Sequence, residues 1–212
     1  MLNFDIIQKE IKELLRKKLV NGKILLQDCK LIDENSRRSP SYSDPLYVPF
    51  YYHLGKFIKP KSVLSLSFNL GLLEKCFFMS CLETEYFLAF HQTDENVYFS
   101  NRMGFYNIRK SYKKDFDFFT GNMKNDDFHD RIGKRKWDAI FINEEKNYDY
   151  ILYMLEISWE YLSDDGCIII DNALDLKPVK QAYLAFADSV GVKPNFFETR
   201  YGTGILFKQL LI

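Results

Sequence analysis

Two stretches of sequence, joined by a helical pattern, decide the fold of this chain. Residues 137–143 read Trp-Asp-Ala-Ile-Phe-Ile-Asn, and residues 167–171 read Cys-Ile-Ile-Ile-Asp. The nearly continuous apolar run of the first stretch predicts a central strand that is covered on both faces. The three isoleucines of the second stretch predict another strand. A helix is predicted between them, from about Asp149 to Leu162, so the unit predicts two parallel strands joined by a helix.

The same alternation continues on both sides of this unit. Further strands are predicted over 62–67, 86–90 and 116–119, further helices over 71–81, 94–103, 126–132 and 178–190, a turn over 164–166, and a terminal hairpin from 195–199 and 205–207. Pro178 falls in the first turn of its helix, where proline is tolerated. The pattern predicts an α/β fold with a doubly wound, mostly parallel seven-stranded sheet and an antiparallel terminal hairpin.

The first 50 residues follow a different pattern and are predicted to form an arm. Apolar residues recur at helical spacing among Lys and Glu over residues 1–20, which predicts an amphipathic helix. Residues 33–49 are rich in Ser, Asp, Pro and Arg, and their prolines disfavour helix at the preceding residue, so a loop is predicted. We therefore expect an arm over 1–50 and one domain over 51–212.

The composition predicts a globular protein without a strong electrostatic field. The 29 basic residues balance the 29 acidic residues of the 212-residue chain, which argues against a nucleic-acid or membrane-surface protein. The clusters Arg109-Lys110 and Lys113-Lys114 could contact phosphate, but neighbouring acidic residues favour simple solvation. No apolar run approaches the roughly 20 residues of a membrane helix. The four cysteines form no disulfide or zinc pattern and no signal peptide is recognised, so a reduced, cytoplasmic protein is expected.

The central unit resembles a known family, the class I S-adenosylmethionine-dependent methyltransferases. Residues 137–143, Tyr148 and the segment 163–171 resemble the fourth strand, the following helix, the turn and the fifth strand of that family. The entry Lys59-Pro60-Lys61-Ser62 resembles the start of its first strand. The resemblance extends over residues 51–207 and implies a Rossmann-like methyltransferase sheet. The Pro, Ser and Tyr context of residues 39–52 also resembles methyltransferase-like proteins of tailed phages, which implies a virion location if the chain is phage-encoded.

The resemblance implies that S-adenosylmethionine would bind at the end of the first strand, where the family has an acidic residue and three glycines. Aligned on that strand, Ser65 stands in place of the acid, Ser67 and Asn69 replace two glycines, and Gly71 remains. Side chains at those places narrow the cleft and restrict positive φ angles. The loop is therefore expected to be a degraded cofactor site.

Two further positions of the implied cofactor site lack the expected carboxylate. The family carries an acid for the ribose at the end of its second strand, and this chain has His91 and Gln92 there. Either could hydrogen-bond a hydroxyl weakly, although His91 is also expected as a partly buried rim residue. Near the adenine the family often has an acid, and this chain has Asn122. Each lost hydrogen bond costs about 1–3 kcal/mol, so three losses could abolish affinity.

The resemblance also implies where metal-dependent members hold a divalent cation: an Asp after the fourth strand and an Asp-Asn pair after the fifth. This chain has Asn143 at the first position, where it could also contact the cofactor, and Asp171-Asn172 at the second. Glu144 or Glu145 could supply the missing carboxylate. The alternative is that Asp171 and Asn172 cap the turn after a strand.

Two functions remain open from the sequence. The favoured one is a methyltransferase fold that binds no cofactor and serves as a binding or structural module. Aromatic residues make up 17% of the chain, which together with the N-terminal arm suits contact with protein partners. The alternative is an active S-adenosylmethionine-dependent methyltransferase of unknown acceptor, since methyl transfer depends mainly on positioning. An open cleft beside Gly71 would favour the enzyme, and a cleft filled by Phe68 would favour the module.

Overall fold

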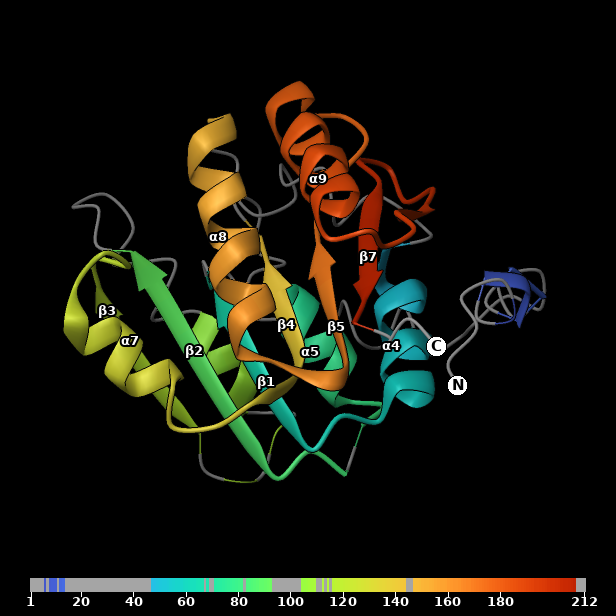
Figure 1. The fold of residues 1–212 in the computed structure, drawn as a ribbon. Coiled ribbons are helices and arrows are strands. Elements are labelled where there is room, and N and C mark those ends of the chain that lie inside the picture. The colour runs from blue at the N-terminus through green and yellow to red at the C-terminus, as the bar shows by residue number, and fades with distance from the viewer. Residues whose placement is uncertain are drawn as a thin grey trace, which may run out of the picture.

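The computed structural model describes residues 6, 8–10, 12–13, 47–66, 68, 71–81, 83–92, 104–109, 112, 114, 116–143 and 147–208. Within these residues seven strands form one sheet in the order β3-β2-β1-β4-β5-β7-β6 (Figure 1). The strands are β1 (Ser62–Leu66), β2 (Tyr86–Gln92), β3 (Asp117–Gly121), β4 (Trp137–Ile142), β5 (Leu162–Ile170), β6 (Asn195–Phe197) and β7 (Thr203–Phe207). The helices are α4 (Tyr47–Ile58), α5 (Leu72–Phe78), α7 (Asp126–Ile132), α8 (Tyr148–Tyr161) and α9 (Lys177–Ser189).

The sheet is parallel from β3 to β5 and antiparallel in its terminal hairpin. Strand β1 pairs in parallel with β2 on one side and with β4 on the other. Strand β7 pairs antiparallel with β5 and with β6. The predicted doubly wound sheet with an antiparallel terminal hairpin is confirmed. The strand order reverses between β1 and β4, and in sheets of this kind ligands bind outside the carboxyl ends of the strands at that point.

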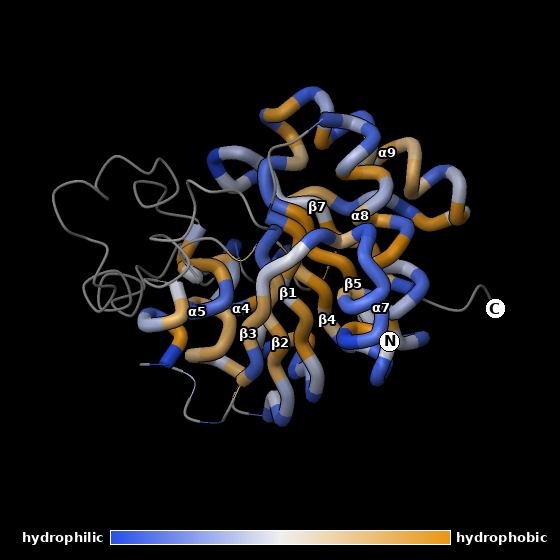
Figure 2. The backbone as a smooth tube through the Cα atoms, turned by 90° about the vertical axis from the view of Figure 1, so that its left-hand side faces the viewer, coloured by the Kyte–Doolittle hydropathy of each residue, from blue (hydrophilic) through white to orange (hydrophobic). Residues whose placement is uncertain are grey.

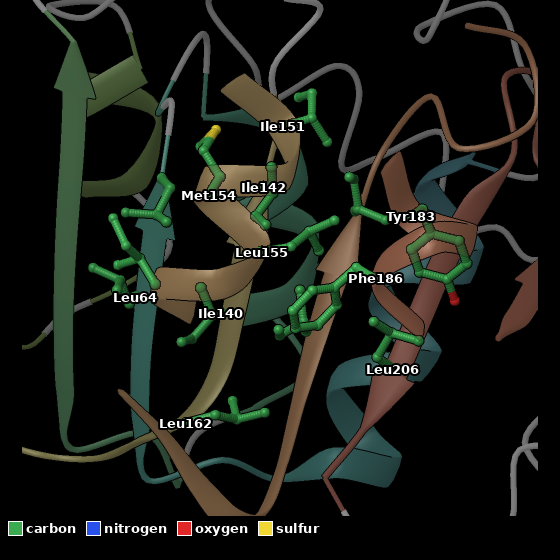
Figure 3. Packing of buried hydrophobic residues seen from close by; sticks show 14 of the residues in the cluster. Leu64, Ile140, Ile142, Ile151, Met154, Leu155, Leu162, Tyr183, Phe186 and Leu206 are labelled. Carbon is green, nitrogen blue, oxygen red and sulfur yellow. The ribbon is translucent and has the colours of Figure 1, made fainter. Parts of the chain in front are cut away.

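Helices cover both faces of the sheet, because successive residues of a strand point to opposite faces. Phe87 and Phe141 pack on one face against α4 and α5. Ile140 packs on the other face against the layer of α7, α8 and α9. Figure 3 shows this second layer, in which Met154 of α8 and Phe186 of α9 lie over the strands. The hydrophobic colouring of β4 and β5 in Figure 2 agrees with strands that are covered on both faces.

The helix α4, which precedes β1, is missing from the sequence prediction. It begins at Tyr47, so the loop predicted over residues 33–49 is wrong at its C-terminal end. Pro49 lies in the first turn, where its nitrogen has no helical hydrogen bond to lose. Eight of the twelve residues of α4 are buried, so no polar face marks it as a helix in the sequence. The boundary expected after residue 50 falls inside this helix.

The N-terminal helix is described only in part. Residues 6, 8–10 and 12–13 are helical, and Gln8 Nε2 donates a hydrogen bond of 3.4 Å to the carbonyl oxygen of Phe196. This contact places the helix beside the edge strand β6. The helix predicted over 94–103 lies outside the described residues, and residues 104–109 form a helical segment after it.

The turn predicted over residues 164–166 is wrong, because these residues belong to β5. The strand begins directly after α8, where Leu162 pairs with Trp137 of β4. The pairing shifts register between Trp137 and Ala139, so the extra residues of β5 are absorbed as an irregularity in the ladder. The two acidic residues and the glycine of this segment indicate a turn locally. In the structure they lie in the irregularity between the Leu162 and Cys167 pairs, within one strand.

Candidate functional site

The residues predicted for the cofactor and metal sites gather at one edge of the sheet. The register pairs Ser65 of β1 with Ala89 of β2 and with Phe141 of β4, so the carboxyl ends of these strands lie side by side (Figure 1). Within or soon after such strand ends lie Ser65, Gly71, His91, Gln92, Asn122, Asn143, Asp171 and Asn172. Ser67, Asn69, Glu144 and Glu145 lie outside the described residues. The topology therefore collects the described candidates, and their individual geometry decides what they can do.

The loop after β1 is packed into the core through Phe68. The backbone amide of Phe68 donates a 3.0 Å hydrogen bond to the carbonyl of Phe90, which continues the pairing of β1 with β2. The Phe68 ring is 0% exposed. Its centroid lies 6.2 Å from that of Phe87 and 5.7 Å from that of Phe118. An aromatic ring thus fills the layer under the loop.

Gly71 ends this loop in the left-handed conformation, with φ of 65°. A Cβ on Gly71 would lie 2.9 Å from the carbonyl oxygen of Gly104, 3.2 Å from Gly104 Cα and 3.1 Å from Phe68 Cζ. The helical segment 104–109 therefore approaches the loop backbone to backbone. The glycine permits both the positive φ and this close approach, and the space beside it is filled by the chain itself.

The end of β2 supplies an amide where a carboxylate is expected. His91 and Gln92 are the last two residues of the strand, and the His91 side chain is buried. The Tyr150 hydroxyl, from the first turn of α8, donates a hydrogen bond to Gln92 Oε1. This bond joins the helix after β4 to the end of β2, across the carboxyl end of β1. Asn122, after β3, accepts a 2.9 Å hydrogen bond from the amide of Lys124 through Oδ1 and so closes a turn.

Glu74 is a carboxylate that the sequence analysis does not single out. It lies in the first turn of α5 and is 1% exposed, and Ser65 Oγ donates a 2.5 Å hydrogen bond to its Oε1. Burial raises the pKa of Glu74 to about 6, the hydrogen bonds from Ser65 and from its own backbone lower it, and the charge of Asp171 raises it. A carboxylate from the next helix thus lies against Ser65 of β1. In the sequence, its position three residues after Gly71 could have indicated a carboxylate close to the end of β1.

Asp171 is bound to α4 rather than presented to a ligand. The Tyr47 hydroxyl donates a 2.9 Å hydrogen bond to Asp171 Oδ2, and the side chain is 2% exposed. Asn172 has φ of 61°, so it turns the chain after β5. Among the residues described, no three His, Cys, Asp or Glu side chains gather as a metal cluster. A divalent cation prefers several oxygen ligands. Because Glu144 and Glu145, the candidates for the missing carboxylate, lie outside the described residues, the metal site stays a prediction.

The tyrosines of α4 extend this hydrogen bonding to the terminal hairpin. Tyr51 shares a 3.0 Å hydrogen bond with Thr203 Oγ1, which lies 3.1 Å from Thr199 Oγ1. Burial and the charge of Asp171 raise the pKa of Tyr47 and of Tyr51, so both hydroxyls stay protonated. We call the following residues the polar network: Tyr47, Tyr51, Ser65, Glu74, Asp171, Thr199 and Thr203. It fastens α4 and α5 to the carboxyl edge of the sheet.

Comparison with solved structures shows which fold this is. The chain superposes on an O-methyltransferase from Bacillus cereus in complex with SAH with a TM-score of 0.67 and 13% identity, covering 92% of this chain and 96% of the other. A putative caffeoyl-CoA O-methyltransferase from Staphylococcus aureus gives 0.65 and 15%, with 95% and 98% covered. The O-methyltransferase TomG from Streptomyces achromogenes, in complex with SAM, gives 0.62 and 9%, with 88% and 89% covered.

The chain therefore has the fold of the class I S-adenosylmethionine-dependent methyltransferases, as the sequence resemblance predicts. Its sequence matches no protein-family model and no curated protein. The resemblance to tailed-phage proteins and the cytoplasmic or virion location stay predictions. No helix of the part that the structure describes has the length and apolar character to cross a membrane.

This fold implies S-adenosylmethionine, and the described residues at the strand ends already make contacts of their own. Gly104 and Phe68 occupy the space beside Gly71 into which a Cβ would point. The carboxylate of Glu74 is buried against Ser65, and Gln92 is bonded to Tyr150. No described carboxylate at the ends of β1 and β2 is left to accept hydrogen bonds from a ribose.

Proposed function

We propose that this chain is a methyltransferase-fold binding or structural module that binds no S-adenosylmethionine and transfers no methyl group. The observation that carries the proposal is the packing beside Gly71, where Gly104 O, Gly104 Cα and Phe68 Cζ lie within 3.2 Å of a Cβ position. Glycine loops normally let backbone approach a ligand. Here the glycine lets one part of the chain approach another. Because fold alone does not determine function, the contacts of the site decide between the two candidates.

The polar contacts at the strand ends support the same proposal. Gln92 is neutral, and its carbonyl oxygen is already used by Tyr150. A ribose entering there would have to break that bond and would gain no charged acceptor. Each such lost hydrogen bond costs about 1–3 kcal/mol, and every 1.4 kcal/mol is about tenfold in affinity. The combined losses are enough to reduce a micromolar site to negligible binding.

Calorimetric titration of the full chain with S-adenosylmethionine, and with its demethylated product, tests the proposal. We expect no binding heat up to millimolar ligand, with circular dichroism confirming a folded sample. A micromolar dissociation constant would overturn the proposal and establish the enzyme alternative as the better one. Incorporation of labelled methyl groups into cell extract above the level of a heat-inactivated control would overturn it as well.

A further inference from the structure

The side chain of Lys75 is buried in the α5 layer without a hydrogen-bond partner. Lys75 lies in the middle of α5 and is 1% exposed. Within the part of the chain that the structure describes, no acceptor lies within hydrogen-bond distance of its Nζ atom. The neighbouring Glu74 points toward β1, where it accepts a hydrogen bond from Ser65, and adjacent residues of a helix do not face each other. No described side chain therefore compensates the ammonium group.

Full burial of an unpaired lysine is unusual and unfavourable. An ammonium group that leaves water loses its hydration, and only a hydrogen-bonding or ionic partner compensates that loss. Lysine is almost never fully buried unless it is paired. Almost all buried polar groups in native proteins are hydrogen-bonded, and an exception is often explained by a bound water, ion or ligand. For a cation, that ligand is an anion.

The face of α5 that carries Lys75 lies against the stretch of chain between β2 and β3. Phe78 lies one turn after Lys75 on the same face, and its ring centroid lies 4.8 Å from that of Tyr112. At the beginning of α5, the Cβ direction of Gly71 meets Gly104. Since helical side chains tilt toward the N-terminus of their helix, Lys75 points toward the carboxyl edge of the sheet, between these two contacts.

The surface opposite Lys75 carries a second buried polar side chain, that of Asn107. In the helical segment that begins at Gly104, the residues Gly104, Asn107 and Ile108 are buried, whereas Phe105 and Tyr106 are exposed. Residues three and four apart share one face of a helix, so Asn107 lies on the face of Gly104, which meets α5. A cationic side chain and an amide side chain thus lie on two facing surfaces within an apolar layer.

The chemistry of this place favours a small monoanion. One ammonium group balances one negative charge, and the carboxylate of Glu74 on the same helix disfavours a doubly charged anion such as hydrogen phosphate. Carboxylate oxygens accept strong hydrogen bonds from ammonium groups. Because Lys75 is buried, a bulky ligand would have to displace the layer that covers it. A carboxylate on a short apolar chain meets these requirements, since its carbon atoms can contact the apolar layer.

We propose that Lys75 binds the carboxylate of a small monocarboxylic acid, of the size of acetate, between α5 and the helical segment that contains Asn107. The inference goes beyond the function proposed above, because such a site is compatible with a binding module and with an enzyme. The Lys75 ammonium donates hydrogen bonds to the carboxylate oxygens, and the apolar layer contacts the carbon atoms. Binding stabilises the folded protein, because the unfolded chain leaves both charges hydrated.

Urea unfolding of the full chain at pH 7 tests the proposal, with sodium acetate replacing sodium chloride at constant ionic strength. We expect acetate to raise the unfolding midpoint of the wild type. The rise should saturate, with a dissociation constant of about 1 mM for so small a ligand. The α-amide of N-acetyl-aspartic acid offers the carboxylate of a protein side chain and should bind at least tenfold more weakly than acetate. Inorganic phosphate should also bind at least tenfold more weakly.

The variant Lys75→Met locates the site. It keeps a flexible apolar chain and removes the ammonium group, so in chloride it should unfold at a higher urea concentration than the wild type. Acetate should no longer shift its midpoint. The matched control is Lys180→Met, at an exposed lysine of α9 in the layer on the other face of the sheet. This control should keep the full response to acetate.

Several results would contradict the proposal. They are the absence of a saturable response in the wild type, an equal response in Lys75→Met, a lower midpoint of Lys75→Met in chloride, and a lost response in Lys180→Met. Tighter binding of the blocked aspartate or of phosphate would overturn the small monocarboxylate as the ligand. Binding of S-adenosylmethionine without displacement of acetate would overturn the proposed function but leave this site standing. Displacement of acetate by S-adenosylmethionine would overturn both.

Discussion

Glu74 and Asp171 place two carboxylates inside the protein near the carboxyl ends of β1 and β5. Glu74 accepts its side-chain hydrogen bond from Ser65, and Asp171 accepts one from Tyr47. Burying a charged group is costly unless hydrogen bonds and nearby charges compensate it. The pKa of Glu74 is raised because its hydrogen bonds compensate only part of the cost of burial. Stability is therefore expected to depend on the protonation of this residue.

The first prediction concerns Glu74→Gln. The pKa of Glu74 rises from an ordinary 4.5 to about 6 on folding, so the folded protein binds this proton more tightly than the unfolded chain. Its contribution favours folding at low pH and is lost as pH rises from about 4.5 through 6. A pKa difference of about 1.5 corresponds to about 2 kcal/mol. Between pH 4 and 7 we expect the free energy of unfolding of the wild type to fall by about 2 kcal/mol relative to that of Glu74→Gln. Urea unfolding at each pH measures it.

The groups that face Glu74 set the controls for this measurement. They are Ser65 of β1, Asp171 after β5 and the tyrosines Tyr47 and Tyr51 of α4. Both tyrosines keep their protons throughout this pH range, because their pKa values are raised above ordinary. Glu85→Gln, at an exposed residue before β2, serves as the matched control. A parallel pH dependence of wild type and Glu74→Gln would contradict the assignment.

The second prediction concerns Tyr47→Phe. The substitution keeps the ring and removes the hydroxyl that donates to Asp171 Oδ2 at 2.9 Å. A buried carboxylate that loses a donor destabilises the protein by about 1–3 kcal/mol. Tyr52→Phe on the same helix is the control, since its ring contact with Lys56 is retained, and it should cost less than about 0.5 kcal/mol. Equal thermal unfolding of the two variants would show that the hydrogen bond contributes nothing.

At the scale of elements, the connection from β1 to α5 combines strand pairing with core packing. Phe68 continues the ladder with β2 and buries its ring. Gly71 then begins α5 at a positive φ while lying against Gly104. Three requirements meet in a few residues: strand pairing, ring burial and close backbone approach.

The third prediction separates backbone strain from packing at Gly71. Gly191 has nearly the same backbone, with φ of 67°, but nothing within 4 Å of its Cβ position, whereas Gly71 has Gly104 O at 2.9 Å. Gly191→Ala should therefore destabilise the protein by about 1 kcal/mol, because alanine is strained in the left-handed conformation. Gly71→Ala should cost at least about 1 kcal/mol more, because of overpacking. Chemical unfolding measures both, and equal losses would mean that the approach of Gly104 is not tight.

At the scale of the whole molecule, the described helices α4, α5, α7, α8 and α9 cover a single sheet from two sides (Figure 1). The two apolar layers share the same strands, since alternate residues of β4 and β5 belong to different layers. Neither layer can be exposed without losing the strands that support the other. The domain is therefore expected to unfold as one cooperative unit.

The fourth prediction tests this cooperativity with thiol chemistry. Cys76, Cys81 and Cys167 are buried, and burial raises the pKa of Cys81 and of Cys167. In a Cys29→Ser variant, which removes the thiol outside the described residues, none should react with Ellman's reagent in the native state. All three should react together, at the rate of global unfolding. Earlier reaction of Cys81 alone would indicate that the α5 layer opens separately.

The strands and most helices follow from patterns that the sequence carries locally. The apolar run of β4 and the isoleucines of β5 predict central strands because both faces must be covered, whatever the partners are. The helix α7 is predicted with its observed bounds. The prediction fails for α4, where burial leaves no polar face, and for residues 164–166, which lie in an irregularity between the paired residues Leu162 and Cys167 of one strand.

The sequence by itself determined the fold class and the absence of family carboxylates at Ser65, Gln92 and Asn143, because residue types and spacing are local properties. Only the tertiary structure decided that Gly71 lies against Gly104, that Tyr47 binds Asp171 from 124 positions away, and that Glu74 accepts a hydrogen bond from Ser65. Those contacts depend on where side chains point after helices and sheet have packed. A one-dimensional pattern does not contain that direction, since any of these polar groups could equally have faced water.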